Sequence, residues 1–254
     1  MDGWVGHGAE SSTRSAPAGS GVASSAMQAI VLADGEVGTR EALDAAWPGW
    51  LEDGAIVIAA DGGARHAETL GVRLTGWVGD GDSLGDAGIA ALRAAGIPVR
   101  QVGAAKDESD TELAVHAALE HGADSIVVLG AMGGARFDHA LANVGLLADA
   151  DLRGTPTSLL HPRARITLVS APAPDGRPVH RALPGPVGGL VSLLPQGDGV
   201  AGVTTGGLAY PLSNEPLPAG PARGLSNIRI AADAWVDVRA GRLLVVEAPA
   251  TLLP

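Results

Sequence analysis

The 254-residue sequence contains no cysteine, one phenylalanine and one tyrosine, and aromatic residues make up only 3% of it. The absence of cysteine excludes disulfide bonds and thiol chemistry, and it fits a reducing cytoplasm, which is the predicted location. Hydrophobic residues make up 46% of the chain, so real cores are expected, and with so few aromatic residues they should be aliphatic. No uninterrupted apolar run approaches the roughly 20 residues needed to cross a bilayer, so no membrane partner is predicted.

Basic residues are also scarce. The chain has 17 lysines and arginines against 28 aspartates and glutamates, which gives a formal net charge of −11, and Lys106 is its only lysine. Nucleic acids and anionic membranes bind basic surfaces, so neither is an expected partner. Residues 1–26 are rich in Gly, Ser and Ala and have neither a basic start nor an apolar core. We predict a disordered tail there and no secretory signal.

Two different patterns follow the tail. Between residues 27 and 162, aliphatic runs alternate with helical patterns. The expected strands are QAIVLAD (28–34), AIVIAAD (55–61), TGWVGD (75–80), PVRQV (98–102) and SIVVLGA (125–131), and the expected helices are 86–96, 112–122 and 139–150. This alternation predicts an α/β domain with a doubly wound, mostly parallel sheet, whose ligands lie outside the carboxyl ends of the strands.

Between residues 163 and 254 the helical pattern disappears. Short strand-like runs occur at 165–170, 188–195, 202–212 and 242–248, separated by turn clusters such as QGDG (196–199). Several short strands with Pro and Gly between them predict an all-β, sandwich-like C-terminal domain.

Short acidic segments follow the predicted strands of the first domain. They are DGGAR (61–65), GDGDS (79–83), KDESD (106–110) and RFDH (136–139). The carboxyl ends of parallel strands share one rim, so these segments would bring together Asp61, Asp80, Asp82, Asp107, Asp110 and Asp138. Two carboxylates about 4 Å apart repel by roughly 4 kcal/mol at an effective dielectric near 20. Because hard divalent cations prefer oxygen ligands, we predict a Mg²⁺ site that holds phosphates.

Each acidic segment also has a purely structural interpretation. DGG and GDG are ordinary turn sequences, KDESDTE can begin a helix with Asp110 as its N-cap, and RFDH can form a surface ion pair. Their ordered occurrence at successive strand ends favours a shared site. Backbone N–H groups of the Gly62-Gly63 and Gly133-Gly134 turns are candidates to hold phosphate oxygens. No GxxxxGK[ST] loop occurs, so a Walker-type nucleotide site is not expected.

The ordered set DGGA, GDxDS, KDxxD and GG(x)RxDHxLAN, followed by VSLLP, VTTGGLAYPL and LSN, resembles the thiamine pyrophosphokinase family from about residue 28 to residue 248. The resemblance implies an enzyme that transfers the pyrophosphoryl group of ATP to the thiamine hydroxyl and releases AMP. It also implies that an α/β domain binds Mg·ATP. A β-sandwich domain is then expected to complete the thiamine pocket across a homodimer interface.

The resemblance also assigns roles to residues. The implied Mg²⁺ ligands are Asp61, Asp80, Asp82 and Asp110. The implied catalytic residues are Asp80, Asp82, Asp110, Arg136 and Asp138. The implied nucleotide contacts are Asp61, Gly62, Gly63, Lys106, Asp107, Arg136, His139 and Asn143. The implied thiamine contacts are Tyr210, Ser226 and Asn227.

The chain departs from the family pattern at several positions. Gly81 replaces an aromatic residue, Arg65 ends the DGGAN motif, Ala135 is an additional residue before Arg136, and Ile228 follows the Ser-Asn pair. None removes an implied magnesium ligand, so they bear on substrate affinity and not on the type of reaction. Two other functions stay open: a thiamine- or nucleotide-binding sensor without turnover, and a metal-dependent phosphoesterase. The identity of the general base also stays open among the acidic residues.

Overall fold

The computed structural model describes residues 26–103, 105–173 and 175–250, so residues 1–25 of the predicted tail lie outside the described part. The first half contains a parallel sheet in the order β4-β3-β2-β1-β5-β6. Its strands are β1 (Gln28–Leu32), β2 (Ile56–Ala60), β3 (Gly76–Gly79), β4 (Val99–Gln101), β5 (Ser125–Leu129) and β6 (Thr157–His161). The strands predicted in this half, β1 to β5, are confirmed, and β6 was not predicted.

Helices cover both faces of this sheet. They are α1 (Arg40–Ala46), α2 (His66–Leu70), α3 (Gly85–Ala94), α4 (Asp110–Glu120) and α5 (Phe137–Leu146). Side chains of a strand alternate between the two faces, so Val31 packs in one apolar cluster with residues of α4, and Ile30 packs in another with residues of α1, α2 and α3. The chain runs outward from β1 to β4 and returns through α4 to β5, which lies on the other side of β1. The strand order therefore reverses between β1 and β5, where doubly wound sheets bind ligands.

The start of α4 is fixed by a serine and not by the aspartate that follows. Ser109 is the N-cap, and its hydroxyl accepts a hydrogen bond from the backbone N–H of Glu112 at 3.1 Å. Asp110 is then the first residue of the helix, and capping does not occupy its carboxylate. The suggestion that Asp110 itself caps the helix was therefore wrong by one residue.

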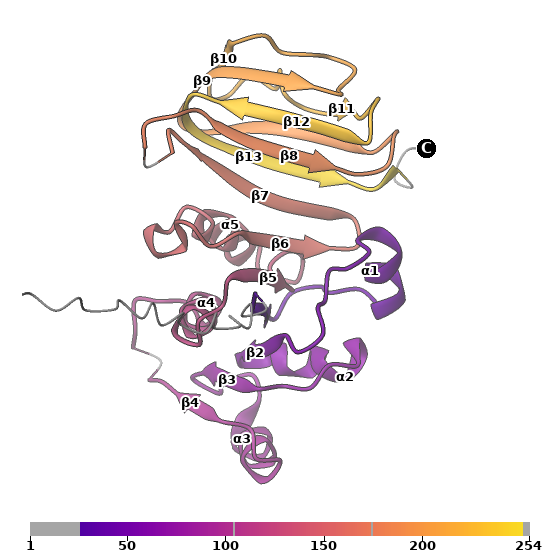
Figure 1. The fold of residues 1–254 in the computed structure, drawn as a ribbon. Coiled ribbons are helices and arrows are strands. Elements are labelled where there is room, and N and C mark those ends of the chain that lie inside the picture. The colour runs from indigo at the N-terminus through magenta and orange to yellow at the C-terminus, as the bar shows by residue number, and fades with distance from the viewer. Residues whose placement is uncertain (1–25, 104, 174, 251–254) are drawn as a thin grey trace, which may run out of the picture.

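The second half continues the same hydrogen-bonded sheet. β6 pairs antiparallel with β7, and the order then runs β7-β13-β9-β12-β8, with β10 and β11 paired to β9. These strands are β7 (Ala164–Ala171), β8 (Val179–Pro184), β9 (Leu190–Gly206), β10 (Glu215–Leu217), β11 (Asn227–Ile228), β12 (Asp233–Val238) and β13 (Ala240–Ala248). Aliphatic side chains from β7, β9, β12 and β13 form a common core. Figure 1 shows the α/β half below and this strand-rich half above, meeting at β6 and β7.

The predicted turn QGDG lies inside a strand. β9 runs through it, and the pairing with β13 shifts register where Arg242 opposes Gln196 and Gly241 opposes Val200. Gly197 and Gly199 have φ angles of +64° and +113°, so they form a bulge that bends the strand without ending it. β9 therefore joins the predicted strand 188–195 to the first five residues of the predicted strand 202–212, and residues 207–212 lie outside the named strands.

A buried ion network connects the two halves. The carboxylate of Glu247 on β13 accepts hydrogen bonds from Nε and Nη2 of Arg165 on β7, at 2.8 and 2.9 Å, and it also pairs with Arg229. The side chains of Arg229 and Glu247 are 2% and 3% exposed. The guanidinium of Arg165 lies 4.9 Å from the centre of the Trp47 ring, and Trp47 is the C-cap residue of α1.

Within the described residues, no helix is long and apolar enough to cross a membrane.

Candidate active site

A pocket of about 410 Å³ opens at the carboxyl ends of β1, β2, β3 and β5. Its walls also include the first residues of α4 and α5. The sequence predicted a ligand site outside the carboxyl ends of the strands, and the structure adds that this pocket lies at the reversal of strand order between β1 and β5. All of its lining residues lie between Ala33 and Asn143, so within the described chain the strand-rich half adds nothing to its wall.

Asp61 occupies the centre of the acidic group. It follows β2 directly, is 5% exposed and has a φ of +39°, which non-glycine residues rarely adopt. Trp77 holds its backbone by donating from Nε1 to the Asp61 carbonyl at 2.9 Å. Oδ2 accepts a hydrogen bond from the Ser83 N–H at 3.2 Å, whereas Oδ1 is buried and has no hydrogen-bond partner among the described residues. A buried, unpartnered carboxylate oxygen is costly unless a cation binds it.

Asp80 and Asp110 complete this group. One carboxylate oxygen from each of Asp61, Asp80 and Asp110 lies within 4.8 Å of the others. We call these residues the acidic trio. Burial raises the pKa of Asp110, and its hydrogen bond with Lys106 opposes that rise. Asp80 and Asp61 add to the rise, because three carboxylates in one place disfavour one another's ionisation.

Lys106 is the counter-ion of the trio. Its Nζ lies 2.5 Å from Oδ1 of Asp110 and 3.9 Å from Oδ2 of Asp80, and its side chain is only 15% exposed. An ammonium group on the pocket wall beside these carboxylates can pair with a phosphate oxygen. The chain's only lysine therefore lines the pocket beside the acidic trio, and its contact with phosphate stays a prediction.

Replacing Lys106 with methionine keeps the alkyl stem and removes the charge. The family resemblance implies that ATP binds here, and on that expectation kcat/KM for ATP should fall by about 10²-fold with the loss of the charge beside its phosphates. Initial rates at varied ATP and fixed thiamine would measure this. Lys106→Arg keeps the charge and should lose less activity; equal activity of the methionine variant and the parent would remove Lys106 from the phosphate site.

Two of the other predicted aspartates lie near the trio without joining it. Asp82 lines the pocket but is exposed, and its Oδ1 accepts a hydrogen bond from the Ser83 hydroxyl at 3.1 Å. Asp107 is exposed and does not line the pocket. The predicted metal role of Asp82 and nucleotide role of Asp107 remain predictions.

The two glycine pairs behave differently. Gly133 and Gly134, with φ angles of +76° and +80°, line the pocket, so their backbone is close to any ligand there. Gly62 and Gly63 are buried in the short helix η1 (Asp61–Arg65) and do not line the pocket. A Cβ on Gly63 would lie 2.0 Å from the Leu32 carbonyl oxygen. This pair allows η1 to pack closely against the end of β1.

The N-cap residue and the first two turns of α5 supply several predicted residues. Arg136, His139 and Asn143 line the pocket, and the Asn143 side-chain amide donates to the Ala131 carbonyl at 2.9 Å, which fixes the loop after β5. Asp138 does not line the pocket and pairs with Arg136 through hydrogen bonds of 2.9 and 2.5 Å. The bond from Arg136 holds the pKa of Asp138 far below its ordinary value. In this structure Asp138 orients Arg136.

The three predicted thiamine residues lie together in the strand-rich half. The side-chain amide of Asn227 binds the backbone of Tyr210 twice: Oδ1 accepts its N–H at 3.0 Å, and Nδ2 donates to its carbonyl at 2.7 Å. Tyr210 is 67% exposed, and Ser226 is exposed with a φ of +57°. The buried side chain of Asn227 therefore holds the backbone of Tyr210 in place. The side chains of Tyr210 and Ser226 are exposed and available to a ligand or partner.

The sequence analysis missed Asp34. This residue follows β1 at the reversal of strand order, and it lines the pocket. Its carboxylate accepts a hydrogen bond of 2.5 Å from Nη2 of Arg65, whose Nε donates to the Gly62 carbonyl at 2.7 Å. The unusual arginine at position 65 thus pairs with a carboxylate of the pocket wall, although Arg65 itself does not line the pocket. The position of Asp34 at the end of the central strand was the signal that could have found it.

The structure also accounts for Gly81. This residue is buried with a φ of +88°, and a Cβ there would lie 2.4 Å from Cδ1 of Ile89. Ile89 on α3 fills the space beside this turn, so the missing aromatic side chain leaves no gap around Gly81.

The acidic trio fits a hard divalent cation. It offers carboxylate oxygens only, one of them buried and unpartnered, which are the ligands that Mg²⁺ prefers.

Comparison with protein families gives two matches in chain order. Residues 49–158 match the model described as "Thiamin pyrophosphokinase, catalytic domain", and residues 183–243 match "Thiamin pyrophosphokinase, vitamin B1 binding domain". Together the two matches span about two thirds of the sequence. The chain belongs to the thiamin pyrophosphokinase family. The acidic trio lies in the catalytic match of this family, and Tyr210, Ser226 and Asn227 lie in its vitamin B1 binding match.

Solved structures agree with the family assignment at the level of the fold. A thiamine pyrophosphokinase from Bacillus subtilis superposes with a TM-score of 0.71 at 24% identity, covering 88% of this chain and 99% of that one. A thiamin pyrophosphokinase family protein from Enterococcus faecalis gives 0.71 at 25% identity, with the same coverage. Thiamin pyrophosphokinase from Candida albicans gives 0.65 at 16% identity, covering 87% and 90%. No curated protein matches the sequence.

Proposed function

We propose that this chain is a Mg²⁺-dependent thiamine diphosphokinase, which transfers the pyrophosphoryl group of ATP to the hydroxyl of thiamine and releases AMP. The observation that carries the proposal is the acidic trio with the unpartnered Oδ1 of Asp61, at the ligand-binding edge of a thiamin pyrophosphokinase fold.

Each part of the pocket has a defined task in this reaction. Asp61, Asp80 and Asp110 would hold the metal, with Asp82 on the adjoining wall. Bound Mg²⁺ would neutralise the triphosphate and favour displacement of AMP. Lys106 and Arg136 supply positive charge to the phosphates, and the Gly133-Gly134 backbone allows them to approach closely. Pyrophosphoryl transfer needs orientation and charge stabilisation, and little covalent chemistry from the protein.

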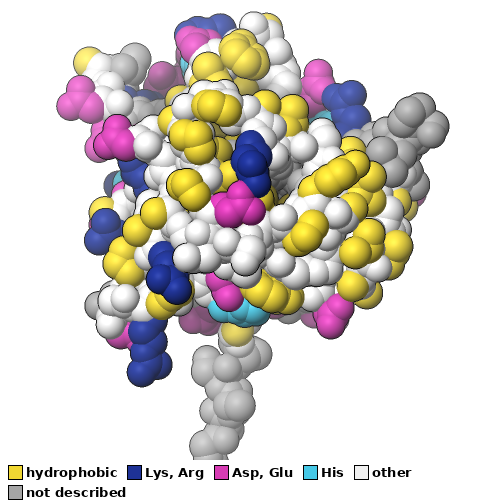
Figure 2. Space-filling view, turned by 90° about the horizontal axis from the view of Figure 1, so that it is seen from above, with side chains coloured by type: hydrophobic (Ala, Val, Ile, Leu, Met, Phe, Trp, Pro, Cys, Tyr) yellow, Lys and Arg dark blue, Asp and Glu magenta, His cyan; other side chains and the backbone are white. Residues whose placement is uncertain are grey.

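The thiamine site is proposed to require a second copy of the chain. Residues 27–162 would bind Mg·ATP, and the sandwich-like residues 163–254 would complete the thiamine pocket of a partner. Tyr210, Leu225 and Ile230 are large apolar side chains of the strand-rich half that are 67%, 53% and 61% exposed. Figure 2 looks onto that half and shows hydrophobic side chains spread over its surface. Burying these three side chains against a partner would stabilise a dimer interface.

Sedimentation equilibrium at micromolar concentration should therefore give twice the mass of one chain. A monomer under these conditions would contradict the homodimer.

We also propose a cytoplasmic location, on the basis of the cysteine-free composition.

Tyr210 is proposed to pack against the cationic ring of thiamine. Tyr210→Ala should raise KM for thiamine about tenfold, the size of a cation–π contact, and leave KM for ATP unchanged. Steady-state kinetics with each substrate varied in turn would measure both values. Equal changes in both KM values would show a general loss of structure and not a lost thiamine contact.

The reaction itself is tested by supplying thiamine, ATP and Mg²⁺ and identifying the products. Equal amounts of thiamine diphosphate and AMP are expected. Release of ADP would overturn the reaction type, phosphate release without thiamine would indicate a phosphoesterase, and tight thiamine binding without product would indicate a sensor.

A further inference from the structure

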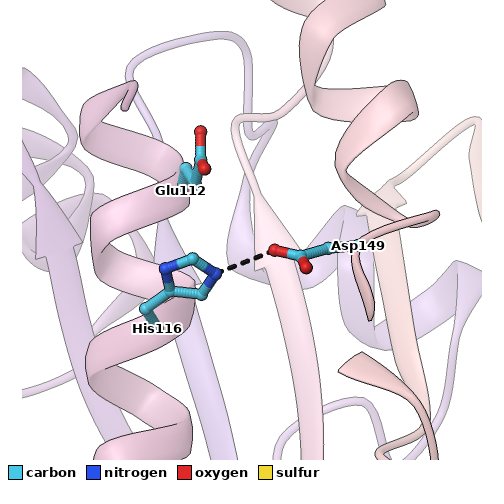
Figure 3. Close-up of side chains that lie close together, drawn as sticks. All are labelled: Glu112, His116 and Asp149. Carbon is cyan, nitrogen blue, oxygen red and sulfur yellow. Dashed lines mark hydrogen bonds and ion pairs between the residues drawn. The ribbon is translucent and has the colours of Figure 1, made fainter. Parts of the chain in front are cut away.

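A second group of possible metal ligands lies outside the pocket, between α4 and the end of α5 (Figure 3). Glu112 and His116 lie one turn apart on the same face of α4. Asp149 follows α5 and is the N-cap residue of the short helix η2 (Ala150–Leu152). One ligand atom from each of these residues lies within 4.8 Å of the other two.

The carboxylate of Glu112 does not make the local hydrogen bond that its sequence position predicts. Ser109-x-x-Glu112 is a capping-box sequence, in which the glutamate side chain normally accepts the backbone N–H of the N-cap residue. Only the serine half of the box forms here, with Ser109 Oγ accepting the Glu112 N–H at 3.1 Å. Among the hydrogen bonds and ion pairs of the described residues, the Glu112 carboxylate has none. It lies instead beside His116 and Asp149.

Asp149 is already oriented as a ligand. Its Oδ1 accepts the Asp151 N–H at 3.0 Å, and its Oδ2 faces Nε2 of His116 at 2.8 Å. The Asp151 N–H and the His116 ring lower the pKa of Asp149, so the carboxylate stays ionised. The Asp151 N–H thus holds Oδ1 in place, as support around metal ligands does, and Oδ2 would exchange its contact with His116 for the metal.

We propose that Glu112, His116 and Asp149 form a Zn²⁺ site separate from the magnesium site. One imidazole nitrogen and two carboxylate oxygens suit Zn²⁺, whereas Mg²⁺ prefers oxygen ligands in an octahedral arrangement. Ligands of a tetrahedral zinc lie about 3.4 Å apart, so His116 and Asp149 must separate by roughly half an ångström. Their side chains are 29% and 20% exposed and can rotate by that amount.

The proposed Zn²⁺ site lies far enough from the magnesium site to act on the packing of the helices and not on the metal ligands of the pocket. His116 lies six residues after Asp110 on α4, which is roughly 9 Å along the helix axis, so an ion here does not share ligands with the magnesium site. It would join α4 to the end of α5. Both helices begin at the pocket, where they carry Asp110 and Arg136. The bound ion would therefore stabilise the pairing of the two helices that support the pocket.

The test uses the full chain without an affinity tag and in millimolar Mg²⁺, which satisfies the acidic trio. Isothermal titration with ZnCl₂ should show one equivalent bound. Zn²⁺ at roughly 100-fold above its Kd should raise Tm by about 5 °C or more, and EDTA should reverse the rise. His116→Gln keeps a polar side chain beside Asp149 and should abolish both effects. His121→Gln is the matched control, because His121 is exposed at the end of the same helix.

Glu112→Gln provides a second variant should His116→Gln fold poorly, and it should weaken Zn²⁺ binding at least about tenfold. The proposal is overturned if the parent protein binds no equivalent of Zn²⁺. It is equally overturned if the Glu112 and His116 variants bind Zn²⁺ as tightly as the parent and the His121 control.

Discussion

Replacing Asp61 with asparagine should lower kcat for thiamine diphosphate formation by about 10³-fold while the fold remains intact. Asparagine has the same shape and tolerates the positive φ that position 61 adopts, so the backbone has no reason to change. Its amide cannot supply the negative charge that the buried Oδ1 offers to a cation. Steady-state kinetics at saturating ATP, thiamine and Mg²⁺ measure the loss.

Stability distinguishes this effect from unfolding. Asp61→Asn removes a buried carboxylate with an unpartnered oxygen, so without Mg²⁺ the variant should melt no lower than the parent. Asp86→Asn is the matched control, since Asp86 is exposed on α3 and should leave kcat unchanged. An Asp61→Asn enzyme with more than about a tenth of parental activity would contradict the assignment of Asp61.

Replacing Glu247 with alanine should lower the free energy of unfolding by about 3–5 kcal/mol, which corresponds to a fall in Tm of about 10 °C. The substitution leaves the guanidinium of Arg229, whose side chain is 2% exposed, without its carboxylate. It also removes the partner of Arg165, which packs on Trp47 of the α/β half. Urea unfolding followed by circular dichroism gives the value.

Two controls test the origin of this loss. Glu120→Ala breaks the exposed pair with Arg100 and should cost less than about 1 kcal/mol. Glu247→Met combined with Arg229→Met removes both buried charges and should recover part of the stability lost in Glu247→Ala. A loss below about 1 kcal/mol for Glu247→Ala would show that the buried network does not stabilise the junction of the two halves.

Five of the six strands of the parallel sheet, β1 to β5, could be predicted because each carries its own signal, whereas β6 was missed. Runs such as AIVIAAD are aliphatic because both faces of the strand are buried. The helical pattern predicted α3, α4 and α5, whereas the shorter helices α1 and α2 were not predicted. The strand-rich half gave weaker signals. DAWVDV (233–238) and VHRALP (179–184) were not predicted, because both are short and carry charged or histidine side chains, so neither stands out as an aliphatic run. QGDG has the sequence of a turn, and only its pairing with β13 makes it a bulge.

The position of the acidic trio could also be predicted from local sequence signals, but the directions of other side chains could not. Asp61, Asp80 and Asp110 follow predicted strands or begin a predicted helix, so sheet topology alone brings them together. The sequence did not show that Asp107 would face solvent or that Asp138 would pair with Arg136. The direction of each side chain depends on the local backbone dihedral angles, which the motif does not specify. The pairs His116–Asp149 and Arg229–Glu247 join distant segments that have no motif. Only the folded chain shows them.

The central claim is that aspartates from separate strand ends hold one divalent cation with its nucleotide. Anomalous diffraction from crystals grown with Mn²⁺ and a non-hydrolysable ATP analogue tests it directly. The account predicts a manganese peak within about 2.2 Å of carboxylate oxygens from at least two members of the acidic trio, with the analogue's phosphates beside Lys106. A nucleotide bound elsewhere, or a metal that contacts none of Asp61, Asp80 and Asp110, would contradict it.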